Sequence, residues 1–94
     1  MAKLALRWTK IALADIESAF EFITNEDRPE TARQIVAKVL AGIEQVRTFP
    51  ESGRKGRVEG TRELVVVTTP FIIIYRQKNA AIEVLSILHH ARKW

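Results

Sequence analysis

A chain of 94 residues, 47% of them hydrophobic, is long enough for one domain with one packed core, and this composition argues against disorder. The absence of cysteine excludes disulfides, cysteine zinc sites and thiol nucleophiles. The net charge of +4 is unevenly placed: residues 1–53 carry seven Lys/Arg and eight Asp/Glu, whereas residues 54–94 carry eight and three. A basic half of this kind suits a polyanion or an acidic protein partner, or it is a solvated surface that maintains solubility. Charge alone leaves both interpretations open.

The sequence also bears on membrane association. Residues 1–10 lack the apolar run and the small-residue cleavage site of a signal peptide. The longest apolar stretch, Leu64–Tyr75, is interrupted by Thr68, Thr69 and Pro70, and it falls short of the roughly 20 residues needed to span a bilayer. We therefore expect a soluble, cytoplasmic protein with no membrane partner.

The first elements in chain order are a short strand and a helix. Alternating apolar residues predict a strand over Leu4–Trp8, and Thr9 is placed to cap a helix over Lys10–Thr24. Apolar residues recur every three or four positions, which predicts a buried stripe of Ala12, Leu13, Ile16, Ala19, Phe20 and Ile23. Three carboxylates are assigned to the solvated face of this helix, namely Asp15, Glu17 and Glu21.

A second helix gives the strongest periodic signal. Pro29 fits a first helical position, and the pattern continues to about Thr48. The predicted buried stripe consists of Ala32, Ile35, Val36, Val39, Leu40, Ile43 and Val46. A short connection predicts that the two helices pack as an antiparallel hairpin, with Gly42 placed where they approach closely.

The remainder of the chain changes to strand patterns. Turn-forming and charged residues predict a loop over Phe49–Arg57. Three strands follow, over Thr61–Val67, Phe71–Gln77 and Ala81–Leu88, with turns between them that favour antiparallel neighbours. The order β-α-α-β-β-β predicts an α+β fold in which a helical hairpin packs on a small twisted antiparallel sheet, with residues 1–94 forming a single domain.

Several strings of residues resemble a known family in their order and spacing. They lie at the start of the first helix, the end of the second and in the last three strands: Trp8–Ile16, Phe49–Arg54, Gly60–Val66, Pro70–Arg76 and Ile82–Trp94. Together they resemble the RelE/ParE toxins. The resemblance implies the toxin of a type II toxin–antitoxin module, of the kind linked to plasmid stabilisation, with a cognate antitoxin as partner. It leaves the target open, because RelE-like members cleave mRNA, typically on the ribosome, whereas ParE-like members inhibit DNA gyrase.

The strand residues separate these two mechanisms. Metal-free RNA cleavage by the 2′-hydroxyl needs an acid, a base and cations that stabilise the phosphorane. RelE-like enzymes carry an arginine and two lysines on these strands. The resemblance places the arginine where this chain has Ile72, and the lysines where it has Glu63 and Val65. A carboxylate and two aliphatic side chains do not stabilise a phosphorane, so this departure disfavours a RelE-type site.

The remaining candidates are basic residues and the C-terminal histidines. If the protein is a ribonuclease, the catalytic residues are His89, His90 and Arg92, with one histidine as general acid or base and Arg92 on phosphate. Adjacent strand histidines point to opposite faces, so the alternative is one buried and one solvated histidine. The residues assigned to target or nucleic-acid binding are Arg54, Lys55, Arg57, Arg62, Arg76, Lys93 and Trp94.

Each of these assignments also has an alternative in which the residue has only a structural role. In the first alternative, residues 54–57 form an ordinary solvated loop. In the others, Arg62 and Glu63 form a surface ion pair, and Trp94 packs back onto the sheet. No metal site and no cofactor are expected. The leading hypothesis is a ParE-like inhibitor of DNA gyrase without chemistry of its own. The alternatives are a ribosome-associated mRNA endonuclease and an inactive, purely binding descendant.

Overall fold

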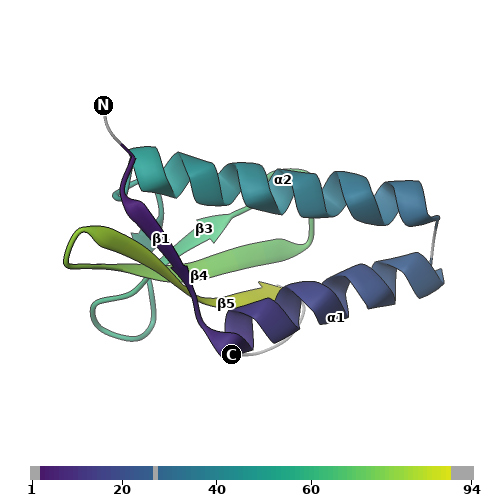
Figure 1. Ribbon diagram of the computed structural model, residues 1–94, viewed down its shortest axis with the longest axis horizontal. Helices are drawn as coiled ribbons and strands as arrows, with labels where there is room; N and C mark the ends of the chain where they lie inside the picture. The colour runs from purple at the N-terminus through teal and green to yellow at the C-terminus, as the bar shows by residue number, and fades with distance from the viewer. Residues whose placement is uncertain (1–2, 27, 90–94) are drawn as a thin grey trace.

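The computed structural model describes residues 3–26 and 28–89, which fold into two helices and a five-stranded sheet (Figure 1). The α+β class and the helical hairpin predicted from the sequence are confirmed. None of the helices in this part of the chain is long and apolar enough to cross a membrane. The elements in chain order are β1 (Ala5–Trp8), α1 (Lys10–Glu26), α2 (Pro29–Thr48), β2 (Arg54–Lys55), β3 (Arg62–Val65), β4 (Phe71–Lys78) and β5 (Ala81–His89).

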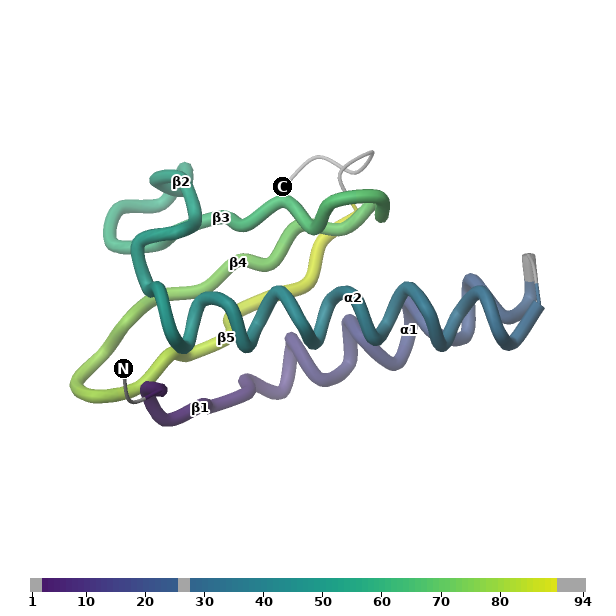
Figure 2. The backbone as a smooth tube through the Cα atoms, turned by 90° about the horizontal axis from the view of Figure 1, so that it is seen from above, coloured from purple at the N-terminus to yellow at the C-terminus, as the bar shows by residue number. Residues whose placement is uncertain are grey.

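Both helices lie on the same side of the sheet, and the core fills the space between these two layers (Figure 2). The largest fully buried side chains come from α2 and from the central strands, namely Val39, Ile43, Val46, Ile73, Ile74, Tyr75, Ile82 and Val84. Gly42 lies on the sheet side of α2, because a Cβ there would be 3.0 Å from Ile73 Cδ1 and 3.3 Å from Leu64 Cδ2. The prediction that Gly42 marks a close approach between the helices is therefore wrong.

The sheet has the strand order β1-β5-β4-β3-β2. Strands β5, β4, β3 and β2 pair antiparallel, whereas β1 joins the edge of β5 in parallel, so the sheet is mixed. Strand β2 lies within the segment predicted as a loop, where Arg54 pairs with Glu63 and Lys55 with Arg62. That loop prediction is wrong for these two residues, because pairing with a distant strand decided their conformation.

The helix starts are as expected, but their buried stripes are narrower. Thr9 caps α1, since its Oγ1 accepts a hydrogen bond from the Ala12 amide at 3.0 Å. Leu13 and Phe20 of α1 and Leu40 of α2 remain 45%, 36% and 45% exposed, so their predicted burial is wrong. A helix that packs against one layer buries only the central rows of its apolar face, and flanking rows stay at the surface.

The strand register leaves an apolar face on the side of the sheet away from the helices. Ile73 and Leu64 point towards α2, so the residues that alternate with them point the other way. Val65 pairs with Ile72, and Ile72 pairs with Leu88, which puts three aliphatic side chains side by side across β3, β4 and β5. Val65 is 46% exposed, and the other two are half-buried. We call these three residues the apolar sheet patch.

Candidate interaction site

Four predicted binding residues meet at the β2–β3 edge of the molecule. Arg54 and Lys55 form β2, Arg57 follows in the next turn, and Arg62 pairs with Lys55 from β3. We call these four residues the basic edge. Its backbone continues the antiparallel ladder through Gly56, whose amide donates to the Thr61 carbonyl at 2.8 Å. The short strand therefore gives the cationic segment a defined backbone conformation.

Tyr75 holds the chain that leads into this edge. Its side chain is fully buried in β4, and its hydroxyl donates to the Pro50 carbonyl at 2.7 Å and accepts the Gly53 amide at 2.9 Å. Burial raises the pKa of the Tyr75 hydroxyl above its ordinary value. Position 53 requires glycine, because a Cβ would lie 2.6 Å from the Tyr75 hydroxyl and 3.0 Å from the Glu63 carbonyl oxygen.

Glu63 holds the segment 54–57 of the basic edge. This residue of β3 is only 6% exposed, and its two carboxylate oxygens have different partners. Oε1 accepts from the Arg54 guanidinium at 3.2 Å, and Oε2 accepts from the Arg57 backbone amide at 3.3 Å. The expected surface pair of Glu63 with Arg62 is wrong, because neighbours on one strand point to opposite faces.

Arg62 instead closes the same loop from the other side. Its guanidinium donates to the Gly53 carbonyl at 2.8 Å and to the Glu51 carbonyl at 3.5 Å. Arg76, on β4, forms a cross-strand ion pair with Glu83 of β5. Within the described residues, the side chains of Lys55 and Arg57 are exposed and have no hydrogen-bond or ion-pair partner.

His89 lies at the opposite end of the sheet. It pairs with Phe71 across β4 and β5, and the two rings meet edge-on with centroids 5.5 Å apart. The basic edge is in register with Tyr75, which lies four residues from Phe71, or about 13 Å along the strand, and β2 is roughly 14 Å across the sheet from β5. The structure therefore does not bring His89 and the basic edge into one site.

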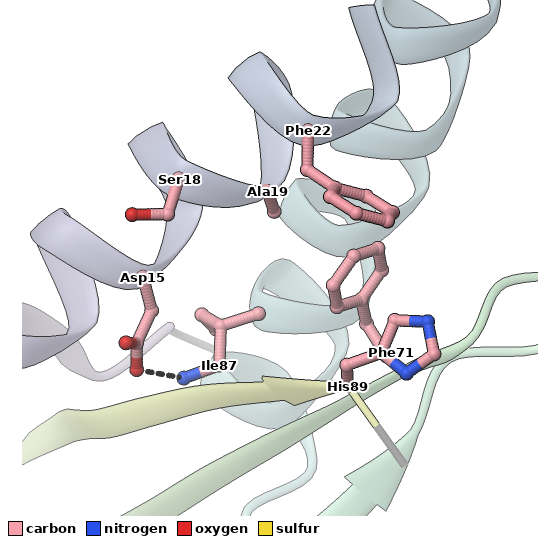
Figure 3. Close-up of a pocket in the computed structure, with 7 residues that line it drawn as sticks. All are labelled: Asp15, Ser18, Ala19, Phe22, Phe71, Ile87 and His89. Carbon is pink, nitrogen blue, oxygen red and sulfur yellow. Dashed lines mark hydrogen bonds between the residues drawn. The ribbon is translucent and has the colours of Figure 1, made fainter. Parts of the chain in front are cut away.

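A pocket of about 310 Å³ opens beside His89 (Figure 3). It lies between α1 and the ends of β4 and β5 and is lined by Asp15, Ser18, Ala19, Phe22, Phe71, Ile87 and His89. Ile11 and Phe22 lie on the α1 flank that borders it, about 20° apart at 100° per residue, and are 66% and 53% exposed. We call this the helix-side pocket.

Asp15 was expected on the solvated face of α1, and that expectation is wrong. Its Oδ2 accepts hydrogen bonds from the Ser86 hydroxyl at 2.6 Å and the Ile87 amide at 3.0 Å. Both donors lie next to the irregularity where Ile74 pairs with Ser86 but Tyr75 pairs with Val84. No local pattern could have revealed this contact, because its partners are 71 and 72 residues away.

Four predicted site residues, His90, Arg92, Lys93 and Trp94, lie outside the described residues. Within residues 3–26 and 28–89, no three side chains of histidine, aspartate or glutamate gather as a potential metal site. The described candidates therefore form two separate surfaces, the basic edge at one end of the sheet and the helix-side pocket with His89 at the other.

Comparison with known proteins identifies the family. The family model described as the ParE toxin of the type II toxin–antitoxin system parDE matches residues 6–94. The chain belongs to the ParE toxin family. It is 34% identical over 94 residues to the putative toxin Y4kP of Sinorhizobium fredii, covering 100% of this chain and 96% of that protein. It is 31% identical over 85 residues to toxin RelE2 of Caulobacter vibrioides, covering 90% and 93%.

A solved structure of this family has the same fold. A chain of the chromosomal ParDE toxin–antitoxin system from P. aeruginosa superposes with a TM-score of 0.84 at 26% identity, covering 93% of this chain and 96% of that chain. The protein is therefore a toxin of a ParDE-type toxin–antitoxin system, and membership of this family implies a cognate antitoxin as its partner.

Proposed function

We propose that this toxin acts on DNA gyrase by binding it, without cutting RNA. The observation that carries the proposal is the apolar sheet patch. Val65 and Ile72 belong to it, and they occupy two of the three positions at which the resemblance places basic residues in RelE-like ribonucleases. The third position is Glu63, whose carboxylate is buried and already engaged by Arg54 and the Arg57 amide.

The chemistry of RNA cleavage explains why this face argues for binding. A phosphorane needs cations or hydrogen-bond donors aimed at its oxygens, and aliphatic side chains supply neither. The four cations of the basic edge lie away from this face, at the opposite end of the sheet from His89. Such a surface suits contact with an acidic or phosphate-rich region of a macromolecular target.

The antitoxin has a separate surface in this proposal. Phe22 lines the helix-side pocket, Ile11 lies on the same flank of α1, and the two side chains are 53% and 66% exposed. An amphipathic segment of the antitoxin would cover this flank of α1, and acidic residues of the same partner would offset the positive charge of residues 54–94. The expected site of action is the cytoplasm, where gyrase is found.

The direct test measures supercoiling of relaxed plasmid by purified gyrase with increasing amounts of toxin. We expect supercoiling to stop, and we expect ribosome-bound mRNA to stay intact under the same conditions. Deletion of residues 92–94 should weaken the inhibition, because Lys93 and Trp94, which are assigned to target binding, are then lost. Normal supercoiling together with cleaved mRNA would show that the proposal is wrong.

A second candidate is an mRNA endonuclease. It is favoured by the 31% identity to a protein named toxin RelE2 and by the position of His89 at the rim of a pocket. In that case His89, His90 and Arg92 would carry the acid–base chemistry and hold phosphate. The double variant His89→Ala/His90→Ala should abolish growth inhibition if the protein is a nuclease, and it should leave gyrase inhibition nearly unchanged if it is not.

A further inference from the structure

We propose that Glu63 is a positioning residue that fixes Lys55 and Arg57 for contact with the target, and that the four cations of the basic edge divide into two structural and two target-facing residues. The inference rests on the proposed gyrase function and deepens it. Its starting point is the cost of burying a carboxylate on a strand of a small sheet. A buried charge is tolerated only when it is paired and hydrogen-bonded.

The contacts of Glu63 offset that cost, and both of them are made to one segment of the chain. One carboxylate oxygen binds the Arg54 guanidinium, and the other binds the Arg57 amide, so a single side chain spans the start and the end of the segment 54–57. Tyr75, on the neighbouring strand, fixes the chain just before it through Pro50 and Gly53. Two buried side chains from adjacent strands therefore anchor one exposed cationic segment.

The same contacts separate the four cations by role. The Arg54 side chain is 63% exposed, but its charge is offset by Glu63. Nη1 of Arg62 donates to the carbonyls of Gly53 and Glu51. Lys55 and Arg57 are exposed, and in the described part of the chain nothing pairs with their side chains. Of the four cations of the basic edge, these two are left to meet an acidic target, and Glu63 fixes the backbone of Arg57 directly.

Anchoring matters because a loop that is ordered before binding pays less entropy when it binds. Releasing the Arg57 amide would keep both cationic side chains in the protein, but the segment that carries them would sample many conformations. The target-facing charge is unchanged by such a release, and only its placement is lost.

Glu63→Val tests the inference, because it removes both contacts and leaves an apolar, strand-forming residue at a buried position. The Arg54 side chain is 63% exposed, so removing its partner leaves a solvated guanidinium and not an uncompensated buried charge. We expect gyrase inhibition to weaken roughly tenfold, as for a loss of preorganisation at an interface. Glu63→Gln keeps an acceptor for the Arg57 amide and should lose less. Glu59→Gln, an exposed carboxylate of the same turn, is the matched control and should behave like wild type.

Two readouts separate positioning from a general structural role. Amide hydrogen exchange should accelerate at Arg57 in Glu63→Val while the Ile73 and Ile82 amides of the core stay protected. In a double-mutant cycle, Lys55→Gln/Arg57→Gln combined with Glu63→Val should inhibit no more weakly than Lys55→Gln/Arg57→Gln alone, because Glu63 acts through those two residues.

Unchanged inhibition by Glu63→Val, additive losses in the cycle, or equally accelerated exchange in the core would each overturn the inference. A wild-type protein that leaves gyrase untouched would instead overturn the proposed function. The same variants would then be compared by growth inhibition on induction in cells, where the positioning role predicts the same rank order.

Discussion

The two ends of the sheet are held by different arrangements of hydrogen-bonded polar side chains. At the basic edge, Tyr75 and Glu63 reach outwards from the sheet and fix an exposed loop. At the other end, Asp15 reaches from α1 onto β5 beside an open pocket lined by both apolar and polar side chains. The first arrangement presents charges at fixed positions, and the second joins two packed layers and leaves apolar surface uncovered. Under the proposed function, the first end would contact the target and the second would be covered by the antitoxin.

The largest expected effect comes from removing the anchor of the basic edge. Tyr75→Ala deletes a fully buried aromatic ring and both hydroxyl contacts, so we expect a loss of about 3 to 5 kcal/mol in the free energy of unfolding. Urea denaturation followed by circular dichroism measures this loss. A cost below about 1 kcal/mol would mean that the loop contributes little to the core and that the contrast between the two ends is overstated.

A smaller effect is expected at the other end. Asp15→Ala leaves the Ile87 amide and the Ser86 hydroxyl without their shared acceptor, which should cost about 1 to 3 kcal/mol. Glu17→Ala, an exposed carboxylate on the same helix, is the matched control and should change stability by less than about 0.5 kcal/mol. Equal effects of the two substitutions would mean that the hydrogen bonds of Asp15 contribute no stability and that Asp15 behaves as a solvated carboxylate.

The smallest effect at neutral pH, and the most specific to the basic edge, concerns the tyrosine hydroxyl. Tyr75→Phe should cost about 1 kcal/mol there, since it removes the bonds to Pro50 and Gly53 but keeps the ring. Burial raises the pKa of Tyr75 in the folded protein, so its contribution is complete below the unfolded value of about 10 and is lost as the pH rises through the folded pKa.

Alkaline titration checks this dependence. Tyr75 is the single tyrosine of the chain, so phenolate absorbance reports its pKa directly. Wild type should lose more stability above about pH 10 than Tyr75→Phe does. Phenolate forming at the ordinary tyrosine pKa in the folded protein would contradict a buried, bonded hydroxyl.

Local periodicity determined much of the fold. The second helix has the predicted bounds, Pro29–Thr48, because one strong apolar stripe and an N-terminal proline specify it without help from distant residues. The cap at Thr9 and the β4–β5 hairpin were predictable for the same reason. The basic residues of the site were also visible in the sequence, since their charge asymmetry needs no structure to count.

Only the tertiary structure decided which residues meet. The parallel attachment of β1, the pairing of Arg54–Lys55 as a strand, and the partners of Asp15 and Glu63 all depend on contacts with distant parts of the chain. A carboxylate on a helix or strand looks solvated in any local pattern, because its hydrogen-bond donors arrive from elsewhere in the fold. The sequence by itself therefore determined both helices, every strand except β2, the helical hairpin and the family resemblance. The register of the sheet and the packing of the helices on one face decided which charges are anchored and which are left for a partner.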